Sequence, residues 1–195
     1  KPVERAASRD ADKRWGWYGL TRFSKPTIAM VNGYCFGGAF TPLIACDFAI
    51  AADDATFGLS EVNWGIIPGG LVSKVVTEVM THRKAMYYAA TGRPFDGKEA
   101  EAIGLVTKSV PADKLKEEVT ALANELMDKS PAVLRAIREA IRAVTHMSID
   151  EAYEYLEAKQ EQMRFRDAEN TRNRGIEEFI EKKTYRPGFE PVGKG

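Results

Sequence analysis

Cysteine and histidine are scarce in this 195-residue chain, with two residues of each. So few cysteines, Cys35 and Cys46, argue against a disulfide framework and favour a reducing, cytoplasmic location. Neither histidine, His82 or His146, belongs to a cluster of His, Cys and Asp at the spacing of metal ligands. We therefore expect no metal site, and we interpret both histidines as structural or solvated.

An excess of charge is also missing, since 28 basic residues balance 28 acidic ones. A nucleic-acid-binding protein usually carries a basic excess or stripe, so we expect no nucleic-acid partner. No apolar run approaches the ~20 residues that span a bilayer, so we expect no membrane insertion. The first residue is Lys1 rather than Met, and the charged stretch 1–5 has no signal-peptide pattern. We interpret this start as entry in the middle of a helix, with further residues upstream.

What the chain does contain is typical of a globular protein, with 44% hydrophobic and 29% charged residues. Short apolar runs alternate with helical patterns as far as about residue 111, which predicts an α/β fold built on a parallel sheet. The expected strands are 26–33, 48–52, 56–59 and 104–110. The expected helices are one that ends near residue 23 and others at 37–44, 71–79, 85–90 and 97–102.

From about residue 112 the pattern becomes entirely helical. Amphipathic segments separated by polar breaks predict four helices, at 114–129, 132–144, 149–164 and 168–182. Ser130 and Ser148 stand at the starts of two of them and are candidate N-caps. We therefore expect an α/β part at 1–111 and a helical part at 112–195, which packs on the first part or on a neighbouring subunit.

A glycine-rich segment, Gly33–Ala39, lies between an expected strand and the next expected helix. Glycines at such a place let the backbone approach a ligand, and the N–H groups at the helix start suit a phosphate or the oxyanion of a polarised carbonyl. The segment lacks the Gly-Lys-Ser/Thr of a phosphate-binding loop and the G-x-G-x-x-G spacing of a dinucleotide site. On these residues alone, Gly37 and Gly38 serve either a ligand or the close packing of the helix.

A single acid, Glu61, follows the next expected strand and has Leu59, Val62 and Trp64 as neighbours. A carboxylate among apolar side chains suits a general acid/base, whereas an isolated loop glutamate is usually a solvated charge. Glycine-containing turns and Trp64 around one charge favour the first interpretation.

Taken together, these segments resemble the crotonase (enoyl-CoA hydratase/isomerase) superfamily. The resemblance is carried by motifs that run along most of the chain, at 33–38, 45–47, 55–61, 65–70, 91–95, 100–106 and 175–179. It implies a crotonase-like spiral of ββα units, of which 1–111 would be the C-terminal part. It also implies that the helical region at 112–195 closes the active site and makes the contacts of a homotrimer or a dimer of trimers.

The resemblance assigns roles to residues of the two segments. It implies that the substrate is an acyl-CoA thioester, with coenzyme A as part of the substrate and no permanently bound cofactor. Gly38 matches the family position whose N–H is the second donor to the thioester oxyanion, with Gly37 beside it in the substrate site. The first donor comes from an upstream segment, typically Ala-Gly-x-Asp-Leu, which this sequence does not contain.

Ordinary family hydratases hold a water between two glutamates, and the matching positions here are Thr41 and Glu61. A one-glutamate arrangement resembles the hydroxycinnamoyl-CoA hydratase-lyases, which add water to feruloyl-type thioesters and cleave the product to an aromatic aldehyde and acetyl-CoA. The segments most similar to this subgroup are 25–38, 59–66, 155–159 and 185–188. The resemblance thus implies Glu61 and Gly38 as catalytic, and Gly37, Thr41 and Trp64 as substrate-binding.

The subgroup holds the phenol of its substrate with tyrosines, and this sequence departs from that pattern. The position that matches the C-terminal tyrosine is Glu157, and Tyr153 lies four residues earlier, on the same face of the expected helix. We therefore expect Tyr153 or Glu157 to meet the ring. Two alternatives remain, namely an enoyl-CoA hydratase or isomerase that uses Glu61 alone, and a catalytically silent subunit.

Overall fold

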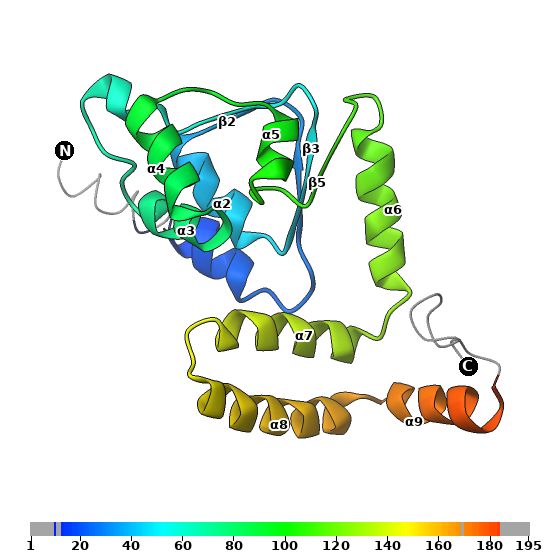
Figure 1. Ribbon diagram of the computed structural model, residues 1–195. Helices are drawn as coiled ribbons and strands as arrows, with labels where there is room; N and C mark the ends of the chain where they lie inside the picture. Colours follow the sequence, from blue (N-terminus) through cyan, green and yellow to red (C-terminus); the bar gives the residue numbers. More distant parts are fainter. Residues whose placement is uncertain (1–9, 11–12, 169, 184–195) are drawn as a thin grey trace. The chain divides into compact units, whose positions relative to one another are not determined.

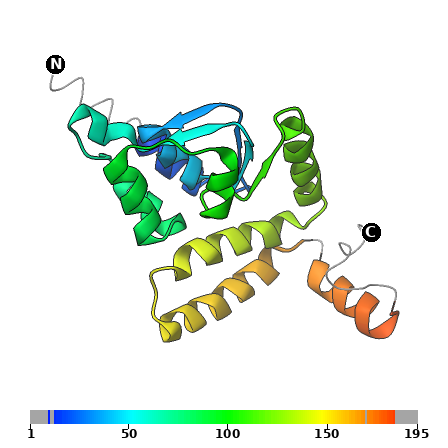
Figure 2. The same ribbon diagram turned by 45° about the horizontal axis from the view of Figure 1, so that its top comes forward.

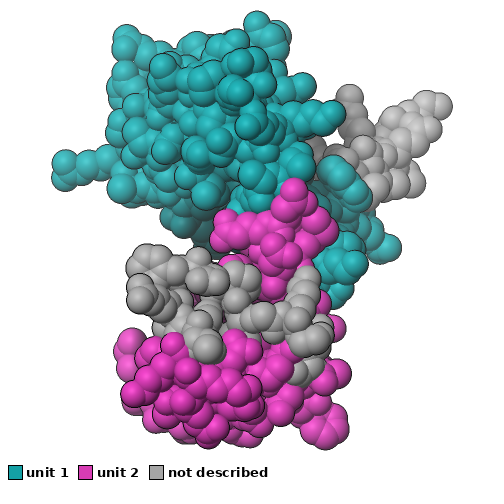
Figure 3. Space-filling model, turned by 90° about the vertical axis from the view of Figure 1, so that its right-hand side faces the viewer, with its two compact units in different colours: residues 1–122 teal, residues 123–195 magenta. Residues whose placement is uncertain are grey.

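The computed structural model describes residues 10, 13–168 and 170–183. The chain forms two compact units, residues 1–122 and 123–195, which are coloured separately in Figure 3. The stretch 1–5 and the segment 185–188 lie outside the described residues. The boundary between the predicted regions, at 111/112, stays a prediction.

Among the described residues of the first unit, five short strands form two sheets, and the strands pair with one another in parallel. The strands are β1 (Ile28–Val31), β2 (Tyr34–Phe36), β3 (Phe48–Ala52), β4 (Thr56–Gly58) and β5 (Lys108–Val110). One sheet has the order β1-β3-β5, and the other pairs β2 with β4. The predicted α/β class with parallel strands is therefore confirmed.

Consecutive strands belong to different sheets, and this makes the chain wind as a spiral. β1 and β2 are separated only by Asn32-Gly33, yet they belong to different sheets. β3 and β4, separated by residues 53–55, also belong to different sheets. Each strand pair is followed by helices, so the repeating unit is the predicted ββα. The helices α2 to α5 gather on one side of the β1-β3-β5 sheet (Figures 1 and 2).

The α-helices that precede α6 (Leu115–Met127) in the first unit follow the predicted order, whereas the short helix η3 (Ser60–Trp64) was not predicted. The helices of this part are the π-helix η1 (Arg14–Gly19), the 3₁₀ helices η2 (Gly37–Ala39) and η3, and the α-helices α2 (Phe40–Ala45), α3 (Val72–Val79), α4 (His82–Thr91) and α5 (Gly97–Ala102). α4 starts three residues before its predicted start, because the Thr81 side chain accepts a hydrogen bond from the Lys84 N–H and caps it. β5 starts later than predicted, because the N–H groups of Leu105 and Val106 bond back to the carbonyl of Ala100 in α5.

A cluster of aromatic rings fills the core between β4, α2 and α4. The ring of Phe57 is fully buried, stacks on Phe95 at 5.6 Å and meets Phe40 edge-on at 6.5 Å. Phe95 also contacts Tyr88, with 4.2 Å between ring centroids. Because Phe57 lies in β4, this packing holds the strand that leads to Glu61.

The second unit is helical, as predicted. It consists of the C-terminal end of α6 (Leu115–Met127) together with α7 (Pro131–Val144), α8 (Ile149–Arg166), α9 (Thr171–Ile176) and the π-helix η4 (Glu177–Glu181). α7 and α8 lie side by side as a helical hairpin (Figures 1 and 2). Ser148 caps α8 through a complete capping box with Glu151, whereas Ser130 stands at the N-cap of α7 without a side-chain capping bond. None of the described helices is long and apolar enough to cross a membrane.

Candidate active site

Parallel pairing of β2 and β4 brings together the two segments that the sequence singled out. The pairs are Tyr34 with Thr56, Cys35 with Phe57 and Phe36 with Gly58. Parallel strands end at the same edge of a sheet, and that edge is where ligands usually bind in α/β folds. Gly37 directly follows β2, and Glu61 lies three residues after the end of β4, so both residues are at this edge.

The Glu61 carboxyl lies directly over Gly37. A Cβ on Gly37 would stand 2.9 Å from Glu61 Oε1 and 3.5 Å from its Cδ. The other carboxylate oxygen, Oε2, is buried and has no hydrogen-bond partner among the described residues. A polar atom in that state is normally satisfied by water or by a ligand. Glu61 is therefore not the solvated loop charge that the sequence left as an alternative.

The space beside this carboxyl is open at Gly38. A Cβ on Gly38 would meet nothing within 4 Å, and the residue is exposed. Gly37 and Gly38 are the first two residues of η2, and N–H groups at a helix start have no helical partner. Thr41 lies one turn later, half-buried on α2, and shares a helix face with the two glycines. The edge thus offers a carboxyl, main-chain donors and a hydroxyl residue.

Large apolar side chains from the same two segments are exposed to solvent. Trp64 at the end of η3 is 78% exposed, and Ile67 shortly after it is equally exposed. Tyr34 in β2 is 86% exposed. Apolar surface that the chain leaves open near a polar group is a common feature of sites for largely apolar ligands.

Helix α4 supports the short helix η3 that carries Glu61. A Cβ on Gly92, the left-handed residue after α4, would lie 2.7 Å from Asn63 Nδ2 and 2.9 Å from Val62 Cγ1. The two elements therefore meet with no room for a side chain at that point. Gly92 belongs to the motif at 91–95, but nothing in the sequence pattern predicted its contact with Asn63.

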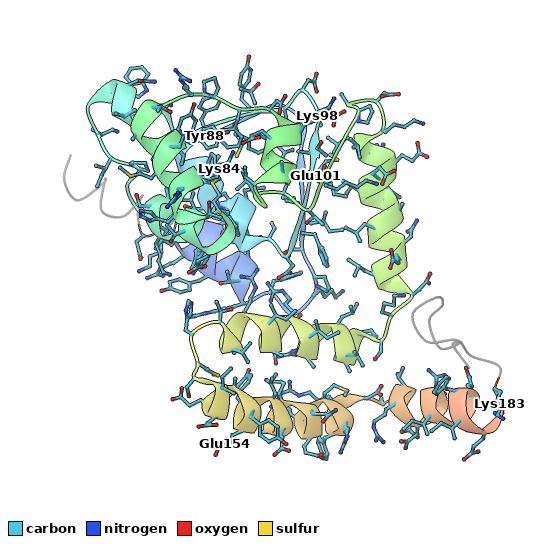
Figure 4. All side chains as sticks on the ribbon, in the orientation of Figure 1. Lys84, Tyr88, Lys98, Glu101, Glu154 and Lys183 are labelled. Atoms are coloured by element: carbon cyan, nitrogen blue, oxygen red, sulfur yellow. The ribbon has the colours of Figure 1, made fainter. Side chains whose placement is uncertain are left out.

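A polar cluster in turn fixes α4 against α5, and its two α4 members, Lys84 and Tyr88, are labelled in Figure 4. Lys84 Nζ and the Tyr88 hydroxyl, both on α4, donate to Glu99 Oε1 at 2.6 and 2.7 Å. Hydrogen bonds from Lys84 and Tyr88 lower the pKa of Glu99, while burial and the Glu99 contact raise that of Tyr88. The cluster keeps α4 in place beneath η3, and it could not be foreseen from motifs because its members are far apart in sequence.

Tyr153 and Glu157, the residues expected to meet the substrate ring, lie on α8 in the second unit. Both are exposed, and the Tyr153 side chain is 66% exposed. No described contact joins either of them to Glu61, so their roles stay predictions.

Two further candidates concern nucleophilic and metal chemistry. Cys35 is buried in β2, and its burial raises the pKa of the thiol to about 11, which favours the interpretation as packing rather than as a nucleophile. Among the described residues, no group of three or more His, Cys, Asp or Glu side chains is arranged to hold a metal ion.

The fold and this edge define a member of the enoyl-CoA hydratase/isomerase family: residues 3–190 match that family, and the chain belongs to it. It is 47% identical over 177 residues to a hydroxycinnamoyl-CoA hydratase-lyase from Pseudomonas fluorescens, a match that covers 91% of this chain and 64% of that protein. It is 37% identical over 169 residues to a probable enoyl-CoA hydratase from Mycobacterium bovis, which covers 86% and 64%. The chain thus spans about 64% of the length of these relatives.

A solved structure supports the same conclusion. The crystal structure of an enoyl-CoA hydratase from Bacillus anthracis matches with a TM-score of 0.84 and 26% sequence identity, over 100% of this chain and 72% of that one. The predicted family and its ββα fold are therefore confirmed.

Proposed function

We propose that this chain supplies the acid/base and one oxyanion donor of an acyl-CoA hydratase-lyase that acts on a hydroxycinnamoyl-CoA. The observation that carries the proposal is the Glu61 carboxyl, which lies over Gly37 with Oε2 buried and without a hydrogen-bond partner in the part of the chain that the structure describes. That carboxyl stands beside the exposed start of η2, where the Gly38 N–H can donate a hydrogen bond to the oxyanion of a thioester.

The first step is addition of water across the double bond. Glu61 as carboxylate takes one proton from a water, whose oxygen forms a bond to the β-carbon. The electrons of the double bond move toward the thioester, and the Gly38 N–H donates to the oxyanion that forms. Glu61 then returns the proton to the α-carbon, which gives the β-hydroxy thioester and restores the carboxylate.

The second step is cleavage of the bond between the α- and β-carbons. Glu61 takes the proton of the β-hydroxyl, the C–O bond becomes a carbonyl, and the Cα–Cβ electron pair enters the thioester enolate. Protonation of the α-carbon by Glu61 then releases acetyl-CoA beside the aromatic aldehyde. One carboxylate is enough because each step takes up and returns one proton.

The substrate class is supported by two features. The hydroxycinnamoyl-CoA hydratase-lyase from Pseudomonas fluorescens is 47% identical to this chain. By the resemblance, Thr41 matches the first of the two acids of the two-glutamate hydratases and Glu61 the second, so a scheme with two carboxylates lacks one of them here. A para-hydroxyl on the ring would ease attack at the β-carbon, because a quinone-methide-like form shares the charge.

The remaining elements of the proposal concern binding and assembly. Trp64 and Gly37 would contact the acyl group. Tyr153 or Glu157 would form a hydrogen bond with the phenol hydroxyl of the substrate. Coenzyme A would enter only as part of the substrate. We further propose a homotrimer or a dimer of trimers in the cytoplasm.

The test uses the protein as the cell makes it, mixed with feruloyl-CoA. Loss of the feruloyl-CoA ultraviolet band with formation of vanillin and acetyl-CoA is the expected result. Removal of a general acid/base typically costs ~10²–10⁴ in rate, so Glu61→Gln should lower kcat by at least that factor. Glu125→Gln, an exposed glutamate on α6, is the control and should keep full activity. Full activity of Glu61→Gln would end the proposal.

An enoyl-CoA hydratase is the second candidate, because the probable hydratase from Mycobacterium bovis is 37% identical to this chain. Loss of the ultraviolet band without aldehyde would select it. No reaction while feruloyl-CoA still binds would select a silent family member.

A further inference from the structure

Gly37 has no side chain, and the Glu61 carboxyl packs against the place where a side chain would begin. A Cβ there would lie 2.9 Å from Oε1, which is too close, whereas Cδ at 3.5 Å and Oε2 at 4.0 Å would be at ordinary van der Waals distances, so one oxygen of the carboxyl lies in the space that a methyl group would need. At a distance under 3.0 Å one of the two atoms must move, and here the atom that can move at low cost is Oε1, at the far end of the Glu61 side chain. None of the residues that the structure describes makes a hydrogen bond to Glu61 Oε2 that could hold the carboxyl in place.

Backbone conformation and steric fit can be separated at this position. Gly37 has φ +52°, in the left-handed region that disfavours any residue with a Cβ. Gly70 has a similar φ of +61°, but a Cβ on it would meet nothing within 4 Å. Alanine at Gly70 therefore suffers the backbone strain alone, whereas alanine at Gly37 suffers the strain and the collision with Glu61.

We propose that Gly37 is a positioning residue whose missing side chain forms the slot that fixes the Glu61 carboxyl at the strand edge. The proposal deepens the proposed function, on which its catalytic consequence rests. Shape rather than hydrogen bonding then holds the acid in line with the open space at Gly38. A methyl group in the slot pushes the carboxyl away from the substrate while it leaves the Gly38 N–H in place.

The steric part of the proposal is tested by stability, without any substrate. Gly37→Ala and Gly70→Ala are each made in the wild-type protein and in a Glu61→Ala background, and urea unfolding is measured. Strain in the left-handed region alone should shift the unfolding equilibrium about tenfold, so Gly70→Ala should cost the same in both backgrounds. Gly37→Ala should cost more than Gly70→Ala in the wild type, by the small amount needed to move the end of the Glu61 side chain, and should match it once Glu61 is absent.

Equal costs of Gly37→Ala in the two backgrounds would overturn the slot. So would failure of the Gly37→Ala/Glu61→Ala double variant to fold while Gly70→Ala folds. Failure of Gly37→Ala alone to fold, with the double variant folded, supports the proposal, because only the carboxyl differs between them.

The catalytic part is tested by the split between kcat and KM. A displacement of about 1 Å in a catalytic group can cost ~10² in rate, so Gly37→Ala should lose roughly that factor in kcat with KM little changed. Gly70→Ala should retain kcat. Wild-type kcat in Gly37→Ala, with activity still lost in Glu61→Gln, would overturn the positioning role. If Glu61→Gln is fully active, the proposed function fails, while the stability comparison still decides the slot.

Discussion

Asp47 shows why single residues of the family motifs occur where they do. Its carboxylate accepts hydrogen bonds from the N–H and the hydroxyl of Thr27, both at 2.9 Å, and so ties the start of β3 to the start of β1. At position 97 only glycine fits, since a Cβ on Gly97 would lie 2.1 Å from the Ala52 carbonyl oxygen at the end of β3. Both residues build the scaffold of the site and take no part in its chemistry.

Cys35 allows a prediction at the same scale. Its thiol is buried and its pKa is raised to about 11, so at pH 8 it is both protonated and covered. Iodoacetamide should therefore label Cys46, which is half-buried, well before Cys35, as read by mass spectrometry of peptides. Equal labelling rates of the two cysteines in the folded protein would contradict the buried placement.

The same thiol makes the stability depend on pH in the alkaline range. Its folded pKa lies above the unfolded value of 9.0, so the folded state keeps the proton longer. The contribution is fully present below pH 9 and is lost as the pH rises through about 11. Cys35→Ala should flatten the fall of the unfolding free energy over this window, by at most about 1.4 kcal/mol per pH unit.

Two elements of the site were missing from the sequence analysis. The run at 26–33 was expected to be one strand that ends at Asn32-Gly33, whereas a second strand, β2, begins directly after it. β2 has only three residues and η3 only five, which is too short for a hydrophobic period to show. Pairing with β4 stabilises β2, and packing on α4 stabilises η3, so tertiary contacts decide both.

A charged group, Glu139, bridges the two helices of the α7–α8 hairpin. Glu139 on α7 accepts hydrogen bonds from Arg135 Nε at 2.7 Å and from Lys159 Nζ of α8 at 2.9 Å. Those bonds, chiefly the one from Arg135, lower the pKa of Glu139 to about 2. A carboxyl with a lowered pKa stabilises the folded state above its unfolded pKa, here 4.5, and that stabilisation is lost as the pH falls through about 2.

Glu139→Gln should therefore lower the free energy of unfolding by about 1 kcal/mol at pH 7, a value reduced for the partial exposure of the pair. The difference from wild type should shrink steadily below pH 4.5. Glu161→Gln is the control, because the ion pair of Glu161 among the described residues is with Arg164 of its own helix, and the change should alter stability by less than about 0.5 kcal/mol. Urea unfolding at pH 7 and pH 3 measures both. A Glu139→Gln effect that is independent of pH would refute the charge as its cause.

At the scale of the whole molecule, the sequence predicted the order of elements, the parallel strands and the neighbourhood of Glu61. Much of this came from motifs that keep fixed spacing, because a ββα spiral places equivalent segments at one sheet edge. Atomic contacts were beyond reach: the carboxyl of Glu61 over Gly37 and the fit of Gly92 against Asn63 depend on how separate elements pack. Patterns along one chain carry no record of such distances.

How the molecule divides is also open to measurement. The sequence predicts a boundary at 111/112. Leu115 of α6, however, is only 4% exposed and belongs to the core of the first unit. Val119 and Leu122 of the same helix are partly buried and pack against this core. The start of α6 should therefore unfold together with the α/β part. Leu126 lies further along the same helix, in the second unit, and is half-buried.

Hydrogen exchange of two matched variants decides where the core ends. Leu115→Ala should cost about 2–5 kcal/mol, the usual range for a buried leucine, and should speed exchange of the amides of β3 and β5. Leu126→Ala shortens the same kind of side chain on the same helix and should leave those amides protected. If both variants leave β3 and β5 unchanged, the core ends before α6, and the boundary read from the sequence is the better one.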